Sequence, residues 1–230
     1  MKRRGRAYVE ASSKVDKTKA YQPEEAVELV KSLSKRKFDE TVEVALNLNI
    51  DTTKSDQQVR SSFTLPHGTG KTKRILVVTK TNAEEAKTAG ADFVGGDEMV
   101  EKISKENWFD FDVIVATPEM MVALGKLGKV LGPKGLMPNP KTGTVTTNVT
   151  AAIENIKKGM IEYRADSNGN VHAIIGKVSF DANKLSENLI AFVNDVIKNK
   201  PSGVRGTFVK NISISSTMGP GVKLDLTRFN

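Results

Sequence analysis

Apolar residues in this chain follow two different periods, and the change between them constrains the fold more than any other feature of the sequence. Near both chain ends apolar and polar residues alternate, as over residues 42–48, which predicts strands with one buried face. Between residues 67 and 159 the apolar residues instead form short continuous runs, such as 75–78 and 113–116. Such runs are typical of parallel strands covered on both faces. The sequence therefore predicts two domains of different architecture.

Residues 67–159 alternate strands and helices, and this order predicts a Rossmann-like, three-layer α/β domain. Antiparallel signals lie on both sides of that segment, in strands over residues 42–48 and 206–216 and in a hairpin turn at residues 167–170. We therefore expect residues 1–66 and 160–230 to form one discontinuous, split antiparallel α+β domain, into which the α/β domain is inserted.

Two amphipathic helices are expected beside the antiparallel strands. Pro23 stands where a first helical residue is favoured, and an apolar face follows it as far as Leu33. The second helix follows Asp181 and stops before Pro201. The first twenty residues are basic and lack apolar periodicity, so they predict an arm that orders on binding.

Composition excludes several classes of function. The chain has no cysteine and only two histidines, which excludes disulfides, thiolate zinc sites and cysteine nucleophiles. Neither His67 nor His172 has an adjacent serine or acid that would suggest a catalytic triad. The longest apolar run, residues 120–124, is far shorter than the roughly 20 residues that cross a bilayer. We expect a soluble, cytoplasmic protein that contacts no membrane.

Two motifs that could carry chemistry fail on closer inspection. Residues 68–72, GTGKT, resemble part of a phosphate-binding loop, but Leu65 stands where the first glycine is required and a strand follows instead of a helix. A basic linker between the domains is the better interpretation. The acidic pairs Asp97/Glu98 and Asp110/Asp112 match no metal-binding loop. We therefore predict no catalytic residue, no metal and no cofactor.

Charge favours a polyanionic partner. The chain has 35 basic and 27 acidic residues, which gives a net charge of +8, and the pI is near 9.5. Two long windows, residues 57–83 and 120–153, contain lysine or arginine but no acid. They are candidate phosphate-facing surfaces. Lysines scattered only for solubility remain the alternative.

Two further segments have a composition suited to RNA. Residues 35–43, KRKFDETVE, combine three cations, one aromatic ring and a strand-borne carboxylate, which can meet phosphates, sugars and a 2′-hydroxyl or guanine edge. Residues 213–220, SISSTMGP, place hydroxyls at alternate strand positions before a glycine turn. A helix end with a core Phe38, and an ordinary exposed strand, are the alternatives.

Residues 131–145, LGPKGLMPNPKTGTV, form a third unusual segment. Three prolines and three glycines punctuate it, two lysines charge it, and no acid interrupts it. Because proline fixes φ and glycine permits unusual backbone shapes, we predict a defined, non-repetitive surface that serves a partner.

The chain resembles the bacterial form of the large-subunit ribosomal protein L-one family in four segments: residues 37–43 (KFDETVE), 131–145, 172–180 (HAIIGKVSF) and 215–221 (SSTMGPG). The resemblance runs in order from about Tyr21 to Leu226. It implies two lobes joined by a hinge near residues 65–69 and 158–161. It also implies direct binding to large-subunit ribosomal RNA, formation of the mobile side stalk involved in release of tRNA from the exit site, and repression of translation by binding the protein's own operon mRNA. The free protein is expected to be a monomer.

The resemblance also implies which residues bind RNA. The first lobe would contribute Arg36, Lys37, Phe38, Thr41, Glu43, Asp166, Lys177, Ser213, Ser215, Thr217, Met218 and Gly219. A weaker contact on the second lobe would involve Lys134 and Lys141 and face ribosomal RNA or exit-site tRNA. An enzyme built on the α/β lobe and a protein-interaction scaffold remain the alternatives. Turnover screening would reveal the first, and absence of RNA from the purified protein the second.

Overall fold

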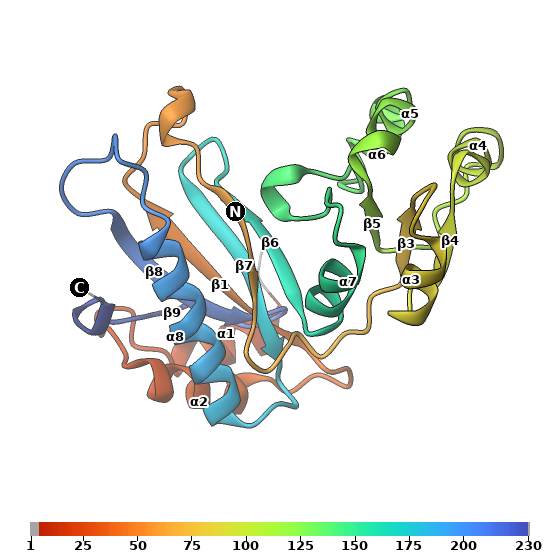
Figure 1. Cartoon of the computed structure of the whole chain (residues 1–230). Helices are drawn as coiled ribbons and strands as arrows, with labels where there is room; N and C mark the ends of the chain where they lie inside the picture. Colours follow the sequence, from red (N-terminus) through yellow and green to blue (C-terminus); the bar gives the residue numbers. More distant parts are fainter. Residues whose placement is uncertain (1–4, 230) are drawn as a thin grey trace. The chain divides into compact units, whose positions relative to one another are not determined.

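The computed structural model of the chain describes residues 5–229, and these divide into two compact units. One unit contains the described residues up to Gly70 together with those from Ile161 onward, and the other is Lys71–Met160. Figure 1 shows the two chain ends in the same unit. Within residues 5–229, no helix is long and apolar enough to cross a membrane.

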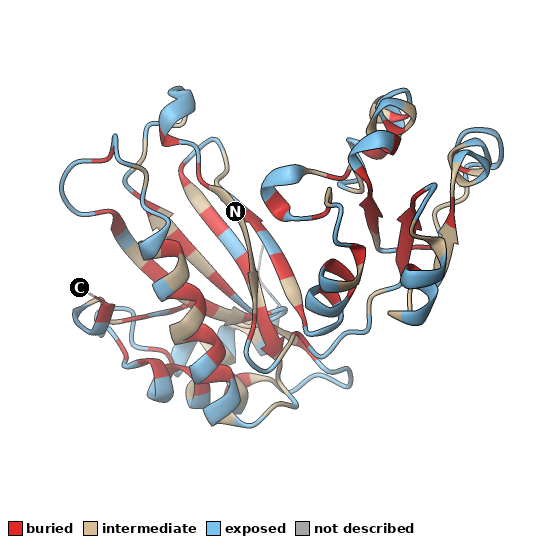
Figure 2. Cartoon of the chain, viewed as in Figure 1, coloured by how far each residue is buried: buried red, intermediate tan, exposed pale blue. Residues whose placement is uncertain are grey.

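The first unit is built on a four-stranded antiparallel sheet with the order β7-β1-β8-β9. β1 (Thr41–Leu48) pairs with β7 (Asn170–Lys177) and with β8 (Val209–Ser216), and β9 (Val222–Lys223) pairs with β8. Every second residue of β1 is buried, as the sequence predicts, and Figure 2 shows this alternation along the strands.

Two helices, α2 (Pro23–Leu33) and α8 (Ala182–Lys198), pack against the buried face of this sheet. α2 begins at Pro23 with two glutamates in its first turn, where the helix dipole favours them. α8 buries Phe192 against Phe63 and Tyr163, which belong to a two-stranded sheet of β2 (Arg60–Thr64) and β6 (Met160–Arg164). The apolar residues of all these elements form one core.

The second unit has a three-stranded parallel sheet in the order β4-β3-β5. Its strands are β3 (Ile75–Val78), β4 (Phe93–Gly95) and β5 (Val113–Ala116). One face packs against α4 (Asp97–Glu106), α5 (Met121–Gly125) and α6 (Gly128–Leu131), and the other against α3 (Ala83–Thr88) and α7 (Val149–Lys157). Because both faces are covered, all four residues of β3 are buried. The predicted fold class, an antiparallel α+β part and a three-layer α/β part, is confirmed.

Several local predictions differ from the structure. The expected arm contains a helix, α1 (Arg6–Ser13), and Val15 is buried in the core; residues 1–4 of that arm lie outside the described residues. The sequence pattern predicts one helix over residues 119–130, but the structure has a short 3-10 helix (Pro118–Met120) followed by α5 and α6. A turn at residues 126–127 separates α5 from α6, and the glycines on either side of it, Gly125 and Gly128, weaken a continuous helix. The apolar pattern over residues 171–180 predicts a strand as far as Phe180, but β7 ends at Lys177 because residues 177–180 form a turn.

Three further short 3-10 helices complete the described chain. They are Ser55–Gln57, Pro140–Thr142 and Thr227–Phe229. The rejected phosphate-loop motif is followed by β3 and not by a helix, so the strand predicted after it is confirmed.

Candidate nucleic-acid interface

The four-stranded sheet carries small and polar side chains on the face opposite α2 and α8, and we call this surface the open face. In β1 it includes Thr41, Glu43 and Asn47, which alternate with the buried residues. The register places Lys177 beside Thr41 and Ser215 beside Glu43. By the same register the open face also includes Ala45, Asn170, His172, Ile174, Asn211, Ser213 and Lys223.

Thr217 closes one corner of the open face by bonding to Thr41. The backbone N–H of Thr41 donates to Oγ1 of Thr217 at 3.0 Å, and the N–H of Thr217 donates to the carbonyl of Thr41 at 3.0 Å. Lys177 Nζ donates to Thr41 Oγ1 at 2.9 Å and to the Asp39 carbonyl at 3.2 Å. These bonds fix the positions of three chain segments, while the Thr217 side chain stays exposed.

A buried carboxylate anchors the turn that follows Thr217. Glu40 is 2% exposed; its Oε2 accepts from the backbone N–H of Met218 at 2.9 Å, and its Oε1 accepts from Ser34 Oγ at 2.5 Å. Burial alone would raise the pKa of Glu40, but the hydrogen bonds from Ser34 and Met218, with the nearby Arg36 charge, hold this pKa below its usual value. Glu40 therefore stays ionised and joins the end of α2 to the Met218 turn.

The neighbouring loop presents both cations and exposed apolar groups. Arg36, Lys37 and Phe38 lie on the exposed stretch between α2 and β1. The Phe38 side chain is 53% exposed and that of Met218 is 49% exposed, which is unusual for large apolar residues. Since the bonds of Glu40 and Thr41 join their two segments, this corner offers apolar contact for a sugar or base beside cations that suit phosphate.

Gly219 has a steric role in the same turn. A Cβ added at Gly219 would lie 2.5 Å from Ser216 Oγ, on a side chain that is 3% exposed. A side chain at residue 219 would therefore force the Ser216 hydroxyl or the turn itself to move.

The structure brings most of the expected first-lobe residues together on this corner and the adjoining strands. Those gathered here are Arg36, Lys37, Phe38, Thr41, Glu43, Lys177, Ser213, Ser215, Thr217, Met218 and Gly219.

Asp166 lies at the hairpin turn before β7, at the end opposite Lys177; the strand itself, from Asn170 to Lys177, spans about 23 Å at roughly 3.3 Å per residue. Its carboxylate accepts from the backbone N–H groups of Asn168 and Asn170, each at 2.8 Å, and from the Asn170 side chain at 3.2 Å. These bonds, that from the Asn170 backbone above all, lower the pKa of Asp166. Asp166 thus shapes the hairpin turn and is not part of the Thr217 corner.

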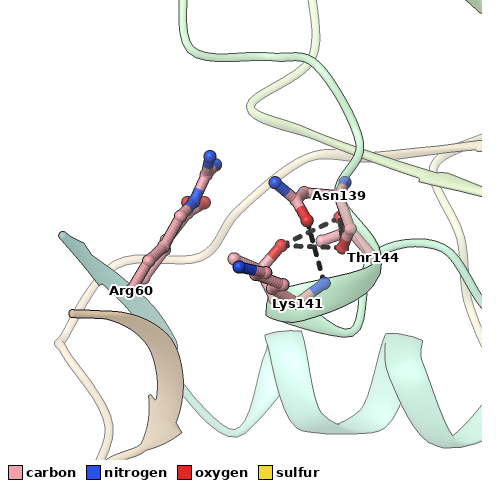
Figure 3. A network of polar contacts seen from close by, with 6 residues as sticks. Arg60, Asn139, Lys141 and Thr144 are labelled. Carbon is pink, nitrogen blue, oxygen red and sulfur yellow. Dashed lines mark hydrogen bonds and ion pairs between the residues drawn. The ribbon is translucent and has the colours of Figure 1, made fainter. Parts of the chain in front are cut away.

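In the second unit, the proline-glycine segment is ordered by its own hydrogen bonds. Thr144 Oγ1 accepts from the N–H of Asn139 at 2.8 Å, and Asn139 Oδ1 accepts from the N–H of Lys141 at 2.8 Å (Figure 3). Ala116 N–H donates to the Thr144 carbonyl at 2.9 Å, which holds the segment beside β5. Lys141 is exposed on this loop.

Lys134 has an intramolecular partner in that segment. Its Nζ lies 4.2 Å from the centroid of the Phe109 ring, a cation–π contact that ties the segment to the loop before β5. The Lys134 ammonium group therefore already has a partner within its own unit.

Sequence reasoning missed the role of Glu40 and several polar residues of the open face. Asn47 Nδ2 donates to Asn170 Oδ1 at 2.7 Å, beside His172 and Asn211 on the same face. The alternation that identified Glu43 would also have placed Asn47 there. For Glu40, which directly precedes the strand, the sequence contains no comparable signal. Among residues 5–229, no group of three or more His, Cys, Asp or Glu side chains could hold a metal ion.

Comparison with known proteins adds the relatives of this chain. The sequence model of the Ribosomal protein L1p/L10e family matches residues 30–220. "Large ribosomal subunit protein uL1" of Mycoplasma capricolum is 58% identical over 95% of this chain and 96% of its own length. The protein of the same name from Mesoplasma florum is 60% identical over 92% of this chain and 93% of its own length.

Proposed function

The chain belongs to the Ribosomal protein L1p/L10e family, and from this membership we propose that it is a structural constituent of the large ribosomal subunit that binds large-subunit ribosomal RNA. The resemblance stated from the sequence is thereby confirmed at the level of the family. The named relatives are ribosomal proteins and not enzymes, which also confirms the prediction that this chain is not an enzyme.

The observation that supports RNA binding best is the hydrogen-bonded corner of Thr41, Lys177 and Thr217 beside the Glu40-anchored Met218 turn. Bonds within the protein fix its backbone, so few groups need to become ordered when a partner binds. Hydroxyls and the exposed Glu43 carboxylate suit ribose hydroxyls and base edges. Arg36 and Lys37 supply phosphate contacts whose strength depends on salt.

The remaining expectations are part of the same proposal. The twelve first-lobe residues form the main RNA contact, with Asp166 acting at the hairpin end. Lys134 and Lys141 make a weaker contact with ribosomal RNA or exit-site tRNA. We also propose that the chain works as two domains, residues 1–66 with 160–230 and residues 67–159, whose bounds lie within four residues of those of the two compact units. The chain works as a cytoplasmic monomer when free. In the ribosome it forms the mobile side stalk that assists tRNA release, and free protein binds its own operon mRNA and represses translation.

A binding titration of the full chain against a fragment of large-subunit ribosomal RNA from the side stalk tests this function. We expect Thr217→Ala or Met218→Ala to reduce affinity by about five- to tenfold, because a hydrogen bond or apolar contact of this kind is worth about 1–1.5 kcal/mol. Thr207→Ala, at an exposed threonine before the other end of β8, is the matched control and should bind like the wild type. Wild-type affinity in both corner variants would contradict the proposed site.

The same titration repeated at several salt concentrations tests the role of the cations. Affinity should fall roughly 10- to 100-fold between 50 and 200 mM salt if about three side chains neutralise phosphates. A titration that does not change with salt would remove Arg36 and Lys37 from the interface.

A further inference from the structure

A solvent-open hollow lies beside the Met218 turn, on the side of α1. α1 forms one wall, the end of α2 and the loop after it form the second, and the Met218–Gly219 turn forms the third. The lining residues are Ala7, Glu10, Ala11, Lys14, Leu33, Lys35, Arg36, Glu40, Met218 and Gly219.

The chemistry of the walls is divided between apolar and charged groups. Ala7, Ala11, Leu33 and Met218 offer apolar contact. Three cations, Lys14, Lys35 and Arg36, stand at the same hollow, and all three are exposed.

The two carboxylates that line the hollow differ in whether their oxygens already have partners within the protein. Both oxygens of Glu40 already accept hydrogen bonds, from Ser34 and from Met218. Glu10 is exposed, and among residues 5–229 its side chain forms no ion pair. The hollow thus combines an excess of positive charge, an apolar surface and one carboxylate that can accept from an amino group or a ribose hydroxyl.

This hollow continues into the corner proposed to bind ribosomal RNA, because Arg36, Met218 and Gly219 belong to both. We propose that one unpaired nucleotide of the bound RNA inserts into the hollow between α1 and the Met218 turn. The cations meet its phosphate, Met218 and the α1 alanines contact its base, and Glu10 accepts from its base edge or ribose. This inference rests on the proposed function, and it adds α1 to the interface.

An unpaired nucleotide fits these features better than an apolar peptide. Splayed-out bases of single-stranded loops are the parts of RNA that proteins read by such local contacts. A hydrophobic peptide would bring no charge to match three cations, whereas each nucleotide carries one phosphate next to one flat, largely apolar surface.

The test fills the hollow from an exposed helix position. Ala7→Trp places a large ring in the hollow without touching the core, since Ala7 is exposed on α1. Val9→Trp is the matched control, because Val9 is 56% exposed on the same helix but does not line the hollow. Both variants are titrated as full chains against the ribosomal RNA fragment. We expect at least a tenfold loss of affinity for Ala7→Trp and less than a twofold change for Val9→Trp.

A second measurement identifies the nucleotide. The chain has no native cysteine, so Ala7→Cys carries a photo-crosslinker at a single place, and we expect crosslinks to one unpaired nucleotide. Replacing that nucleotide by an abasic one should weaken binding to the wild type and leave binding to Ala7→Trp unchanged. Equal effects on both proteins would overturn the inference.

Failure of the inference and failure of the proposed function give different results. If Ala7→Trp binds like the wild type while Thr217→Ala binds weakly, the corner binds RNA and the hollow does not. If the wild type itself ignores the ribosomal RNA fragment, the proposed function and the inserted nucleotide are both refuted.

Discussion

The backbone N–H of Met218 donates a 2.9 Å hydrogen bond to the carboxylate of Glu40, which joins two segments 178 residues apart in the chain. The other oxygen of the same carboxylate accepts from the hydroxyl of Ser34, the residue that directly follows α2. One buried, ionised side chain thus fixes the helix end, the start of β1 and the turn after β8. The candidate interface is built around a residue that does not itself belong to its exposed surface.

Glu40→Ala should destabilise the protein and disorder the Met218 turn. The variant leaves the Met218 N–H and the Ser34 hydroxyl without their acceptor at a site that is 2% exposed, so we expect the free energy of unfolding to fall by about 1–3 kcal/mol. Urea denaturation measures this change. Glu40→Gln is the milder control, because its carbonyl can still accept from Met218 and its amide can donate to Ser34. If the free energy of unfolding fell as much in Glu40→Gln as in Glu40→Ala, this explanation would be contradicted.

Gly219→Ala should weaken RNA binding through a clash inside the protein. Its Cβ would meet Ser216 Oγ at 2.5 Å, so the turn or the serine must move. Ser216→Ala removes that oxygen, and the double variant should regain most of the affinity and stability lost by Gly219→Ala. Titration with the ribosomal RNA fragment and thermal unfolding of all four proteins form a double-mutant cycle. If removing the serine oxygen restores nothing, the clash is not the cause.

The regular elements of both units could be predicted because each is encoded locally. The alternation over residues 42–48 was sufficient for β1, and the continuous apolar runs were sufficient for β3 and β5. Proline at the first position of α2 marked its start to the residue. Irregular breaks were less visible: α1 has only a weak apolar pattern, and a turn at residues 126–127, between two glycines, breaks the helix predicted over residues 119–130.

The candidate site could not be assembled from local patterns. Thr41 and Thr217 are 176 residues apart, and only the sheet register shows that they bond. The family resemblance implied that both residues bind RNA, but it gave no reason for them to lie close together. Glu40 had no sequence signal, because a carboxylate before a strand is ordinarily a solvated one. Asp166 was grouped with them by resemblance, whereas its geometry makes it a turn residue at the other end of β7.

Asn188→Ala should loosen the segment that leads out of the first unit. The Asn188 side chain is fully buried; it accepts from the N–H of His67 at 3.0 Å and donates to the carbonyls of Gly68 at 3.1 Å and Ile175 at 2.8 Å. We expect a loss of about 2–4 kcal/mol of stability, since three buried groups lose their partners.

Hydrogen exchange should also become faster at residues 67–70 in that variant, because their anchor on α8 is lost. Asn183→Ala, on the exposed face of α8, is the control and should leave exchange at these residues unchanged. Unchanged exchange in Asn188→Ala would show that other contacts hold the segment.

Tyr163 makes the stability of the folded protein depend on pH in the alkaline range. Burial, together with the hydrogen bond that its hydroxyl donates to Asp195 at 2.8 Å, raises the pKa of Tyr163 to about 12 from 10.0. The folded state therefore favours the neutral phenol, and the resulting stability is complete below pH 10 and is lost as the pH rises to about 12. The corresponding free energy is roughly 2–3 kcal/mol.

Tyr163→Phe has no titrating group at this position. Comparing it with the wild type therefore separates the effect of the phenol on stability from that of the lysines, which titrate in the same pH range. Near neutral pH it should be less stable than the wild type by about 1 kcal/mol, because Asp195 and Asn199 lose the hydroxyl. Between pH 10 and pH 12 the wild type should lose more than this advantage, so the two denaturation midpoints should converge and then cross, with Tyr163→Phe the more stable protein near pH 12. Parallel midpoints over that interval would mean that the phenol ionises alike in the folded and unfolded chains, and that the bond to Asp195 does not hold its proton.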